Sequence, residues 1–310
     1  MSTKRPRETR RARRVAASRR SPTPVHRDLE GRTHLLVHRD ALGRTERLAL
    51  SEPLFTEEWQ NTVAVAAAST AHGLLCEDHS LRGAVKLARS AMAGTSKIAE
   101  GALARSPERP PACRSGCAHC CYQAVGVSAP EVFAIHDHLR ATRTPAELAA
   151  VVRRVREADD RTRGMTPAAR LSPELPCPLL EAERCSIYEV RPLACRGKNS
   201  LDAALCERTL REPEARAELL AGTLTVPCFR EPIRAFHAVA AGLQLALAEL
   251  HGLDVAPLEL TAALCTLLED PERVAERWLA GEHPFEAARG GDGGHNAALR
   301  ELSGRRGTGG

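Results

Sequence analysis

The residues most able to do chemistry are cysteines in two close groups. The first group is CRSGCAHCC, residues 113–121, which puts four thiols into nine positions. The second begins at Cys177 and includes Cys185 and Cys195, with Cys206 eleven residues later. Thiolates bind metals, act as nucleophiles or pair as disulfides. Seven cysteines in two close groups are typical of a thiolate metal site.

A metal site needs ligands on all sides, and one short segment covers only one side of a tetrahedral zinc ion or an iron–sulfur cluster. We therefore expect the two groups to share one site. The adjacent Cys120 and Cys121 have side chains that diverge, which suits two ions or a cluster better than a single ion. Thiolates suit both zinc and iron, so the ligand type does not distinguish them. The predicted ligands are Cys113, Cys117, Cys120, Cys121, Cys177, Cys185 and Cys195, with Cys206 as an eighth and Cys228 as a weaker candidate.

Cations beside the second group fit such a centre. Four thiolates around a zinc ion, or around an oxidised cubane cluster, leave a net charge of about −2 that is costly to bury. Arg191 and Arg196 flank Cys195 and are predicted to offset this charge as cofactor-binding residues. Tyr188 as a donor to a sulfur, and His119 as a nitrogen ligand, are weaker alternatives.

Two further cysteines, Cys76 and Cys265, occur singly in helical patterns. A single buried cysteine usually behaves as a small hydrophobic residue. We expect both to pack against apolar neighbours away from the metal site.

The motifs are also similar to a known family. C-x3-C-x2-C-C, followed by Cys-Pro-Leu and by Cys-Ser-Ile-Tyr-Glu-Val-Arg-Pro-Leu-Ala-Cys-Arg, resembles the YkgJ family of cysteine-cluster proteins. The resemblance covers residues 113 to about 206 and includes VSAPEV. This chain has three residues between its first two cysteines, where the commoner family form has two. The resemblance implies a zinc- or iron-chelating module. Some relatives carry it within proteins linked to lysine methylation of flagellin, so an iron–sulfur enzyme of protein-modifying methyl transfer is the alternative function.

Two other enzyme classes share parts of the first group. Its first three cysteines reproduce the radical-SAM spacing, but prolines precede them and helical patterns follow, where that class needs a strand and an alternating barrel. Cys117-Ala-His-Cys120 has the C-x-x-C form of a dithiol oxidoreductase without the expected βαβ context. The sequence has no phosphate-binding loop and no dinucleotide glycine fingerprint. Any enzymatic interpretation therefore rests on the metal alone.

Two helices are expected to position the cysteine groups. Ser128 with Glu131, and Thr144 with Glu147, form capping boxes ahead of apolar residues at helical spacing. These helices follow the first group directly and form a hairpin that can bring the second group back to it. Several prolines in and around the second group make a continuous helix there improbable, so loops and short strands are expected.

The remaining apolar residues also recur mostly at helical spacing. Helices are expected from Thr56, over 81–103, and over 233–250 with Gly252 as C-cap, and a hairpin is expected over 33–50. The fold class is therefore mainly α, a helical body with an irregular cysteine-rich metal-binding module that contains loops and short strands. The expected organisation is a disordered basic tail (1–30), an N-terminal helical region (31–110), the cysteine module (111–230), C-terminal helices (231–285) and a flexible tail (286–310).

Composition indicates the cellular compartment and the redox state of the thiols. A chain of 310 residues with 43% hydrophobic content can bury a core without disulfides, so its eleven cysteines need another reason. No apolar run of about 18 residues and no signal-peptide h-region occurs, which predicts a cytoplasmic protein with reduced thiols and no membrane partner. The net charge of +5 comes from the first twenty residues, where nine Lys or Arg accompany one Glu. That arm would make weak, non-specific nucleic-acid contacts at most.

Overall fold

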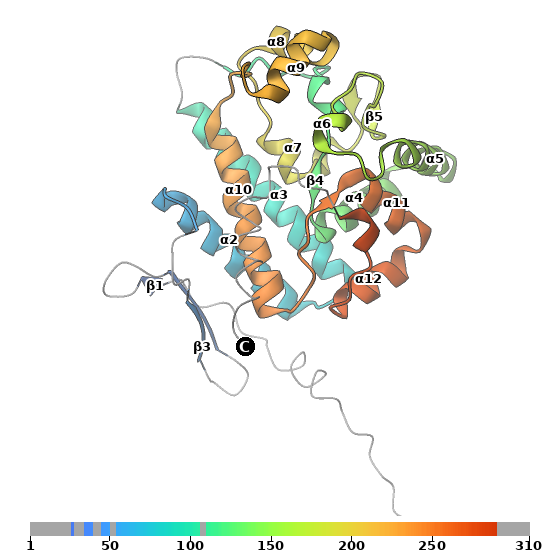
Figure 1. Ribbon diagram of the computed structural model, residues 1–310. Helices are drawn as coiled ribbons and strands as arrows, with labels where there is room; N and C mark the ends of the chain where they lie inside the picture. Colours follow the sequence, from blue (N-terminus) through green and yellow to red (C-terminus); the bar gives the residue numbers. More distant parts are fainter. Residues whose placement is uncertain (1–25, 28–33, 40–44, 50–53, 106–109, 290–310) are drawn as a thin grey trace, which may run out of the picture.

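The computed structural model describes residues 26–27, 34–39, 45–49, 54–105 and 110–289 (Figure 1). Within these residues the protein is mainly α with a few short strands, which confirms the predicted fold class. The basic arm up to residue 25, and with it any nucleic-acid contact, lies outside the described residues. The same holds for residues 290–310 of the predicted C-terminal tail.

The N-terminal strands form a small antiparallel sheet. Its order is β1 (His26–Arg27), β2 (His34–Arg39), β3 (Thr45–Ala49). The pairing of β2 with β3, in which Val37 faces Arg47, is the hairpin expected over 33–50, and the tip of that hairpin lies outside the described residues. β1, which pairs with β2, lies inside the stretch 1–30 that the sequence assigns to the basic tail.

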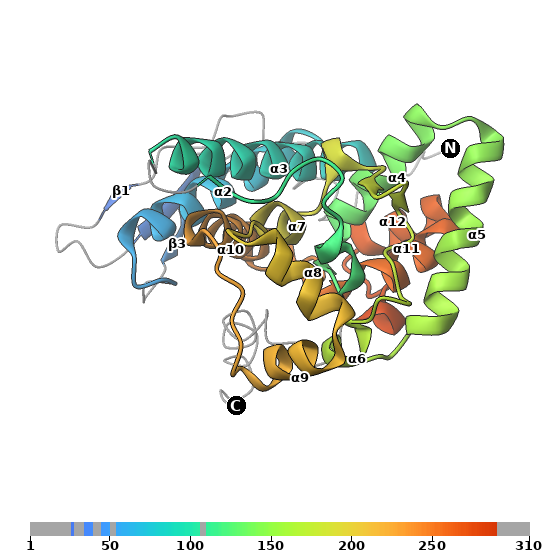
Figure 2. The ribbon, with the colours of Figure 1, turned by 90° about the horizontal axis from the view of Figure 1, so that it is seen from above.

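Three long helices form one side of the body (Figures 1 and 2). They are α2 (Glu58–Glu77), α3 (Leu81–Ala104) and α10 (Arg230–Leu245), and each packs against the other two. The three expected helices are thus present. The last one differs in detail, because its final turn is the π-helical segment η3 (Ala246–Leu250). Gly252 follows with a positive φ of 63°, as expected of a C-cap glycine.

The segment Arg230–Leu250 is by length and composition apolar enough to cross a membrane. Core helices of proteins that span no membrane have the same character, and here α10 packs on α2, α3 and α7 (Leu193–Gly197). Its contact with α2 is close. A Cβ atom on Gly242 would lie 2.0 Å from the carbonyl oxygen of Ala64 and 2.9 Å from Cβ of Ala67. Glycine at this position therefore sets how closely the two helices approach.

Gly242→Ala should lower the free energy of unfolding by about 1–3 kcal/mol, the usual cost of overpacking a core, because α10 must move away from α2. The matched control is Gly94→Ala in α3, where nothing lies within 4 Å of the added Cβ. Alanine's better helix propensity should stabilise that variant by up to ~1 kcal/mol. Urea unfolding of both variants measures the difference, and equal effects would contradict the close approach.

The other side of the body carries the helical pair that follows the first cysteine group. These helices are α4 (Ala129–Thr142) and α5 (Pro145–Thr162), and both predicted capping boxes are present at Ser128 and Thr144. α11 (Leu260–Glu269) packs on both helices, and α12 (Pro271–Leu279) and the 3₁₀ turn η4 (Glu286–Ala288) follow it. The buried ring of Phe133 lies 5.5 Å from that of Trp278 and 6.0 Å from that of Phe285. These aromatic residues belong to one core that runs from α2 to η4.

The cysteine-rich region is made of short elements, as predicted. They are η1 (His119–Tyr122), β4 (Gly126–Val127), which pairs with β7 (Leu258–Glu259), α6 (Pro167–Arg170), the hairpin β5 (Leu180–Glu181) and β6 (Arg184–Cys185), η2 (Tyr188–Val190), α7, α8 (Ala203–Arg211) and α9 (Pro213–Ala221). Cys195 lies in α7, which is a short helix instead of the expected loop or strand. Pro192 is the N-cap of α7, so it precedes the helix and does not interrupt it.

Candidate metal centre

One cavity of about 770 Å³ collects the cysteines of both groups. Its wall is formed by the loop before η1, by η1 itself, by the loop before β5, by β6 and by α7. The cavity-lining cysteines are Cys113, Cys117, Cys120, Cys121, Cys177, Cys185 and Cys195. The structure therefore brings seven of the eight predicted ligands to one place, and we call this place the cysteine cavity.

Backbone hydrogen bonds join the two groups directly. The amide of Cys177 donates to the carbonyl oxygen of Cys121 at 2.7 Å, and the amide of Ser172 donates to the carbonyl oxygen of Tyr122 at 3.3 Å. The first group is also joined to the chain beyond α7, because the amide of Ser200 donates to the sulfur of Cys113 at 3.1 Å. The position of each group therefore depends on the other.

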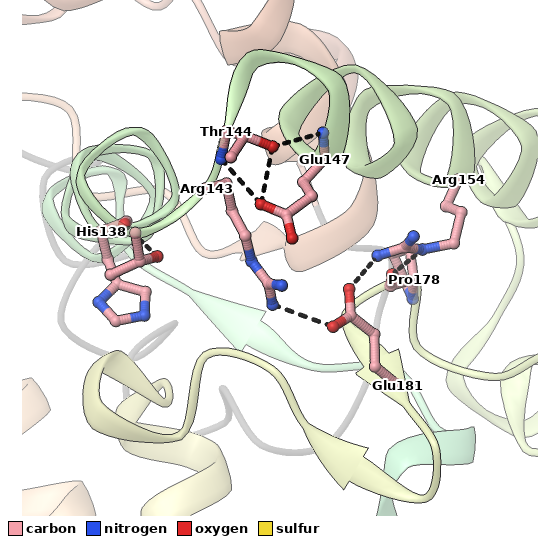
Figure 3. A network of polar contacts seen from close by, with 8 residues as sticks. His138, Arg143, Thr144, Glu147, Arg154, Pro178 and Glu181 are labelled. Carbon is pink, nitrogen blue, oxygen red and sulfur yellow. Dashed lines mark hydrogen bonds and ion pairs between the residues drawn. The ribbon is translucent and has the colours of Figure 1, made fainter.

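The junction of α4 and α5 holds the loop that starts with Cys177 (Figure 3). Arg143 donates to one carboxylate oxygen of Glu181 at 3.0 Å, and Arg154 donates to the other at 2.5 Å. Arg154 also donates to the carbonyl oxygen of Pro178 at 3.2 Å. Because Pro178 follows Cys177 directly, these contacts fix the second cysteine group relative to the helical pair.

A buried carboxylate performs the same task for Cys195. Glu131 closes the capping box of α4, where it accepts hydrogen bonds from the amide and hydroxyl of Ser128 at 2.8 and 2.7 Å. Its other oxygen accepts the amide of Leu193, the first residue of α7, at 2.8 Å. Burial raises the pKa of Glu131, while its amide and hydroxyl donors favour the charged form. Glu131 thus anchors the start of the helix that carries Cys195.

Four cations act on the thiols of the cavity: Arg191, Lys198, Arg196 through Cys185 and Arg170 through Cys177. The pKa of Cys120 is lowered to about 6, first because the thiol of Cys121 donates a hydrogen bond to its sulfur, and then because Arg191 and Lys198 lie nearby. The same pairing raises the pKa of Cys121, which keeps its proton. Arg191 also lowers the pKa of Cys113, Cys185 and Cys195 against the larger effect of burial. Arg191 is therefore a cation near cysteines of both groups.

Two further thiols of the cavity, those of Cys177 and Cys195, are held in the neutral form. Burial raises the pKa of Cys177 to about 12 and raises that of Cys195 strongly. Ionisation of either thiol would raise the pKa of its neighbours further, because Cys177 and Cys195 each interact electrostatically with another cysteine of the cavity. Metal binding to these thiols must therefore release protons.

The surroundings of the cavity suit an anionic centre. Nε of Arg191 is buried and has no hydrogen-bond partner among the described residues, although its guanidinium lies 4.7 Å from the ring centroid of the exposed Tyr188. Two acidic side chains line the cavity, Glu183 and Glu259, against six cationic ones: Arg114, Arg163, Arg184, Arg191, Lys198 and Arg289. A thiolate–metal centre carries negative charge, so its burial here would be offset.

Other predicted site residues lie apart from the cavity wall. Arg196 donates to the carbonyl oxygens of Arg191 and Glu189 and to the hydroxyl of Ser96, so it holds the η2 turn against α3. Cys206, in α8, is close enough to Cys113 for their charges to interact, yet it does not line the cavity. Cys228 is placed similarly, and its thiol hydrogen-bonds to the carbonyl oxygen of Val226 at 3.4 Å. His119 begins η1 without lining the cavity.

The sulfurs of the cavity are spread around it. In the described part of the chain, the one group of three His, Cys or acidic ligand atoms that all lie within 4.8 Å of one another is elsewhere, at His72, Cys76 and His251. Zinc–sulfur bonds of ~2.3 Å in a tetrahedron place sulfurs only about 3.8 Å apart. Among the described residues, no three sulfurs of the cavity all lie within 4.8 Å of one another.

Residues 112–215 match the CxxCxxCC family model, a "Putative zinc- or iron-chelating domain". The CxxCxxCC region covers about a third of the chain and contains all seven cysteines of the cavity. It ends before α10 and begins after α3, so the long helices that pack beside it lie outside the match. No curated protein and no solved structure matches the chain.

Two features escaped the sequence analysis. Lys198 is a further cation of the cavity. Its position three residues after Cys195 could have predicted a cation there. Cys76 was expected to be a small hydrophobic residue. It lies away from the cysteine cavity, but its sulfur has a polar neighbour, Nε2 of His72 at 3.6 Å. Cys265 is buried in the core outside the CxxCxxCC region, as expected.

Proposed function

We propose that this protein binds metal through the cysteine cavity and holds a polynuclear thiolate centre there, an iron–sulfur cluster. The observation that carries this proposal is the meeting of seven thiols, from two groups far apart in the sequence, on one cationic cavity. The description of the CxxCxxCC model supports zinc or iron chelation. The same motifs lead us to place residues 113–206 with the YkgJ-type cysteine-cluster proteins.

The spread of the sulfurs favours a cluster over a single zinc ion. In an iron–sulfur cluster the ligand sulfurs bind different iron atoms, with inorganic sulfide between them, so they lie farther apart than around one ion. Seven thiols also exceed the four that one zinc ion or one cubane uses. The adjacent Cys120 and Cys121, one with a lowered and one with a raised pKa, suit ligands to two different metal atoms.

The residues of the chain then have separate tasks. Cys120 provides a sulfur that is already ionised near neutral pH, which gives an incoming metal its first ligand. Arg191 and Lys198 offset the negative charge of the thiolates, and Glu131 holds α7 so that Cys195 faces the same cavity. An iron–sulfur cluster, when bound, transfers single electrons at a potential that depends on such charges and on burial.

The test is the metal content of the full chain purified without oxygen. We expect a coloured protein with the broad visible absorption of iron–sulfur proteins, ~2 or more iron atoms per chain and matching acid-labile sulfide. A colourless protein that holds zinc and no sulfide would overturn the iron–sulfur assignment. A chain that holds neither metal in the cavity, with all thiols reduced, would overturn metal binding itself.

A further inference from the structure

A second cluster of metal-ligating side chains lies away from the cysteine cavity. His72 and Cys76 are one helical turn apart on α2, and His251 meets them from the end of the π-helical turn after α10. Nδ1 of His72 lies 3.1 Å from Nε2 of His251, and the sulfur of Cys76 lies 3.7 and 3.6 Å from the two ring nitrogens of His72. All three ligand atoms lie within 4.8 Å of one another.

These separations match the edges of a zinc coordination tetrahedron. Zinc–nitrogen bonds of ~2.0–2.1 Å and zinc–sulfur bonds of ~2.3 Å place two nitrogens about 3.3 Å apart, and a nitrogen and a sulfur about 3.6 Å apart. The observed 3.1 Å between Nδ1 of His72 and Nε2 of His251, and 3.7 Å from the sulfur of Cys76 to Nδ1 of His72, are close to these values, and the third separation is within 4.8 Å. A hydrogen-bonded histidine pair also accounts for the distance between the two nitrogens. It does not account for the thiol of Cys76 beside that pair.

The local fold brings His251 to α2, across 179 residues of sequence. The π-helical turn shifts the end of α10 relative to a regular helix, and such turns occur frequently at functional sites. The helical segment then ends before Gly252, whose amide donates to the carbonyl oxygen of Ala248 at 3.1 Å. His72 is buried, whereas Cys76 and His251 are partly exposed, so an ion can reach the group from solvent.

We propose that His72, Cys76 and His251 bind a zinc-type divalent ion at a site separate from the cysteine cavity. Two imidazoles and one thiolate are ligands that zinc accepts, and the fourth position is left for water or another donor. The ion would connect the C-terminal half of α2 to the end of α10. His79 lies outside the group: its ring stacks on that of His251 at 6.0 Å between centroids, while its Nε2 hydrogen-bonds to the carbonyl oxygen of Leu279.

The experiment compares zinc content across full-chain variants equilibrated with zinc chloride and then freed of unbound ion. His251→Gln and Cys76→Ser should each lose one equivalent of zinc relative to the wild type. His79→Gln, a neighbouring histidine of the same cluster of rings, should lose none. Cys195→Ser, which alters the cysteine cavity, should also keep this equivalent, so the test is independent of the function proposed for the cavity.

Cobalt, loaded in place of zinc, gives a second readout. The absorption of thiolate-bound cobalt should lose the contribution of one thiolate in Cys76→Ser and stay unchanged in His79→Gln. His251 stands at a helix end and is partly exposed, so its replacement leaves the core intact and carries the test alone if Cys76→Ser does not fold. Unchanged zinc content in a folded His251→Gln variant would overturn the site and leave a hydrogen-bonded histidine pair.

Discussion

Cys195→Ser is expected to lower the affinity of the cysteine cavity for its metal by at least ~100-fold, the upper range seen when only an outer partner of a ligand is lost. Cys195 is central among the sulfurs of the cavity. Burial raises its pKa most, and electrostatic interaction with Cys177, Cys120 and Cys185 raises it further, so its sulfur lies near members of both groups. A serine hydroxyl keeps the shape of the side chain but is a poor ligand for zinc or iron compared with a thiolate.

The matched control is Cys206→Ser, the same substitution at a cysteine that lies beside the cavity without lining it. It should keep wild-type metal content. Metal per chain after purification, and retention against a competing chelator, measure the effect. A 100-fold loss of affinity also removes about 2.7 kcal/mol of metal-dependent stabilisation at saturating metal. Cys120→Ser should behave like Cys195→Ser, because one centre uses both groups. Full metal content in either variant would show that the groups do not share it.

Sequence patterns predicted most of what positions the cavity. The capping boxes at Ser128 and Thr144 are local signals, because each involves residues only three positions apart, and both are present. The return of the second cysteine group to the first followed from those two helices. The backbone hydrogen bond from the amide of Cys177 to the carbonyl oxygen of Cys121 joins the two groups in the structure.

What the sequence could not show depends on contacts between distant segments. Arg191 and Arg196 are equivalent as sequence neighbours of Cys195, yet only Arg191 lines the cavity. The donors of Arg196 are used by backbone oxygens of η2 and by Ser96 on α3. That difference depends on how α3 packs against α7, which no local pattern encodes.

The histidine–cysteine group was hidden for the same reason. His72 and Cys76 have helical spacing, so they were compatible with the buried face of α2 and gave no separate metal signal. His251 follows a core helix where a C-cap was expected, and only the π-helical turn directs it to α2. A two-ligand pattern with a distant third ligand cannot be told from core packing until the helices are placed.

The metal-free protein is expected to lose stability at alkaline pH because of Cys177. This residue is partly buried in the wall of the cavity, and its pKa is raised from 9.0 to about 12 by burial. An unfolded chain gives up this proton near pH 9, whereas the folded protein keeps it to about pH 12. The folded state therefore binds more protons between these values, so its stability is complete below pH 9 and falls as pH rises above it.

The expected size is about 2 kcal/mol between about pH 8 and about pH 10.5, since each pH unit beyond the unfolded pKa contributes about 1.36 kcal/mol. Urea unfolding at both values measures the loss in the metal-free wild type and in Cys177→Ala. The alanine variant lacks the thiol but keeps every other titrating group, so its loss should be smaller by this amount. Equal losses would contradict the raised pKa. The metal-loaded protein should also lack the loss of stability that Cys177 causes, because a sulfur bound to metal has already released its proton. Comparison of the metal-free with the metal-loaded wild type at the two pH values therefore reports whether Cys177 is a ligand.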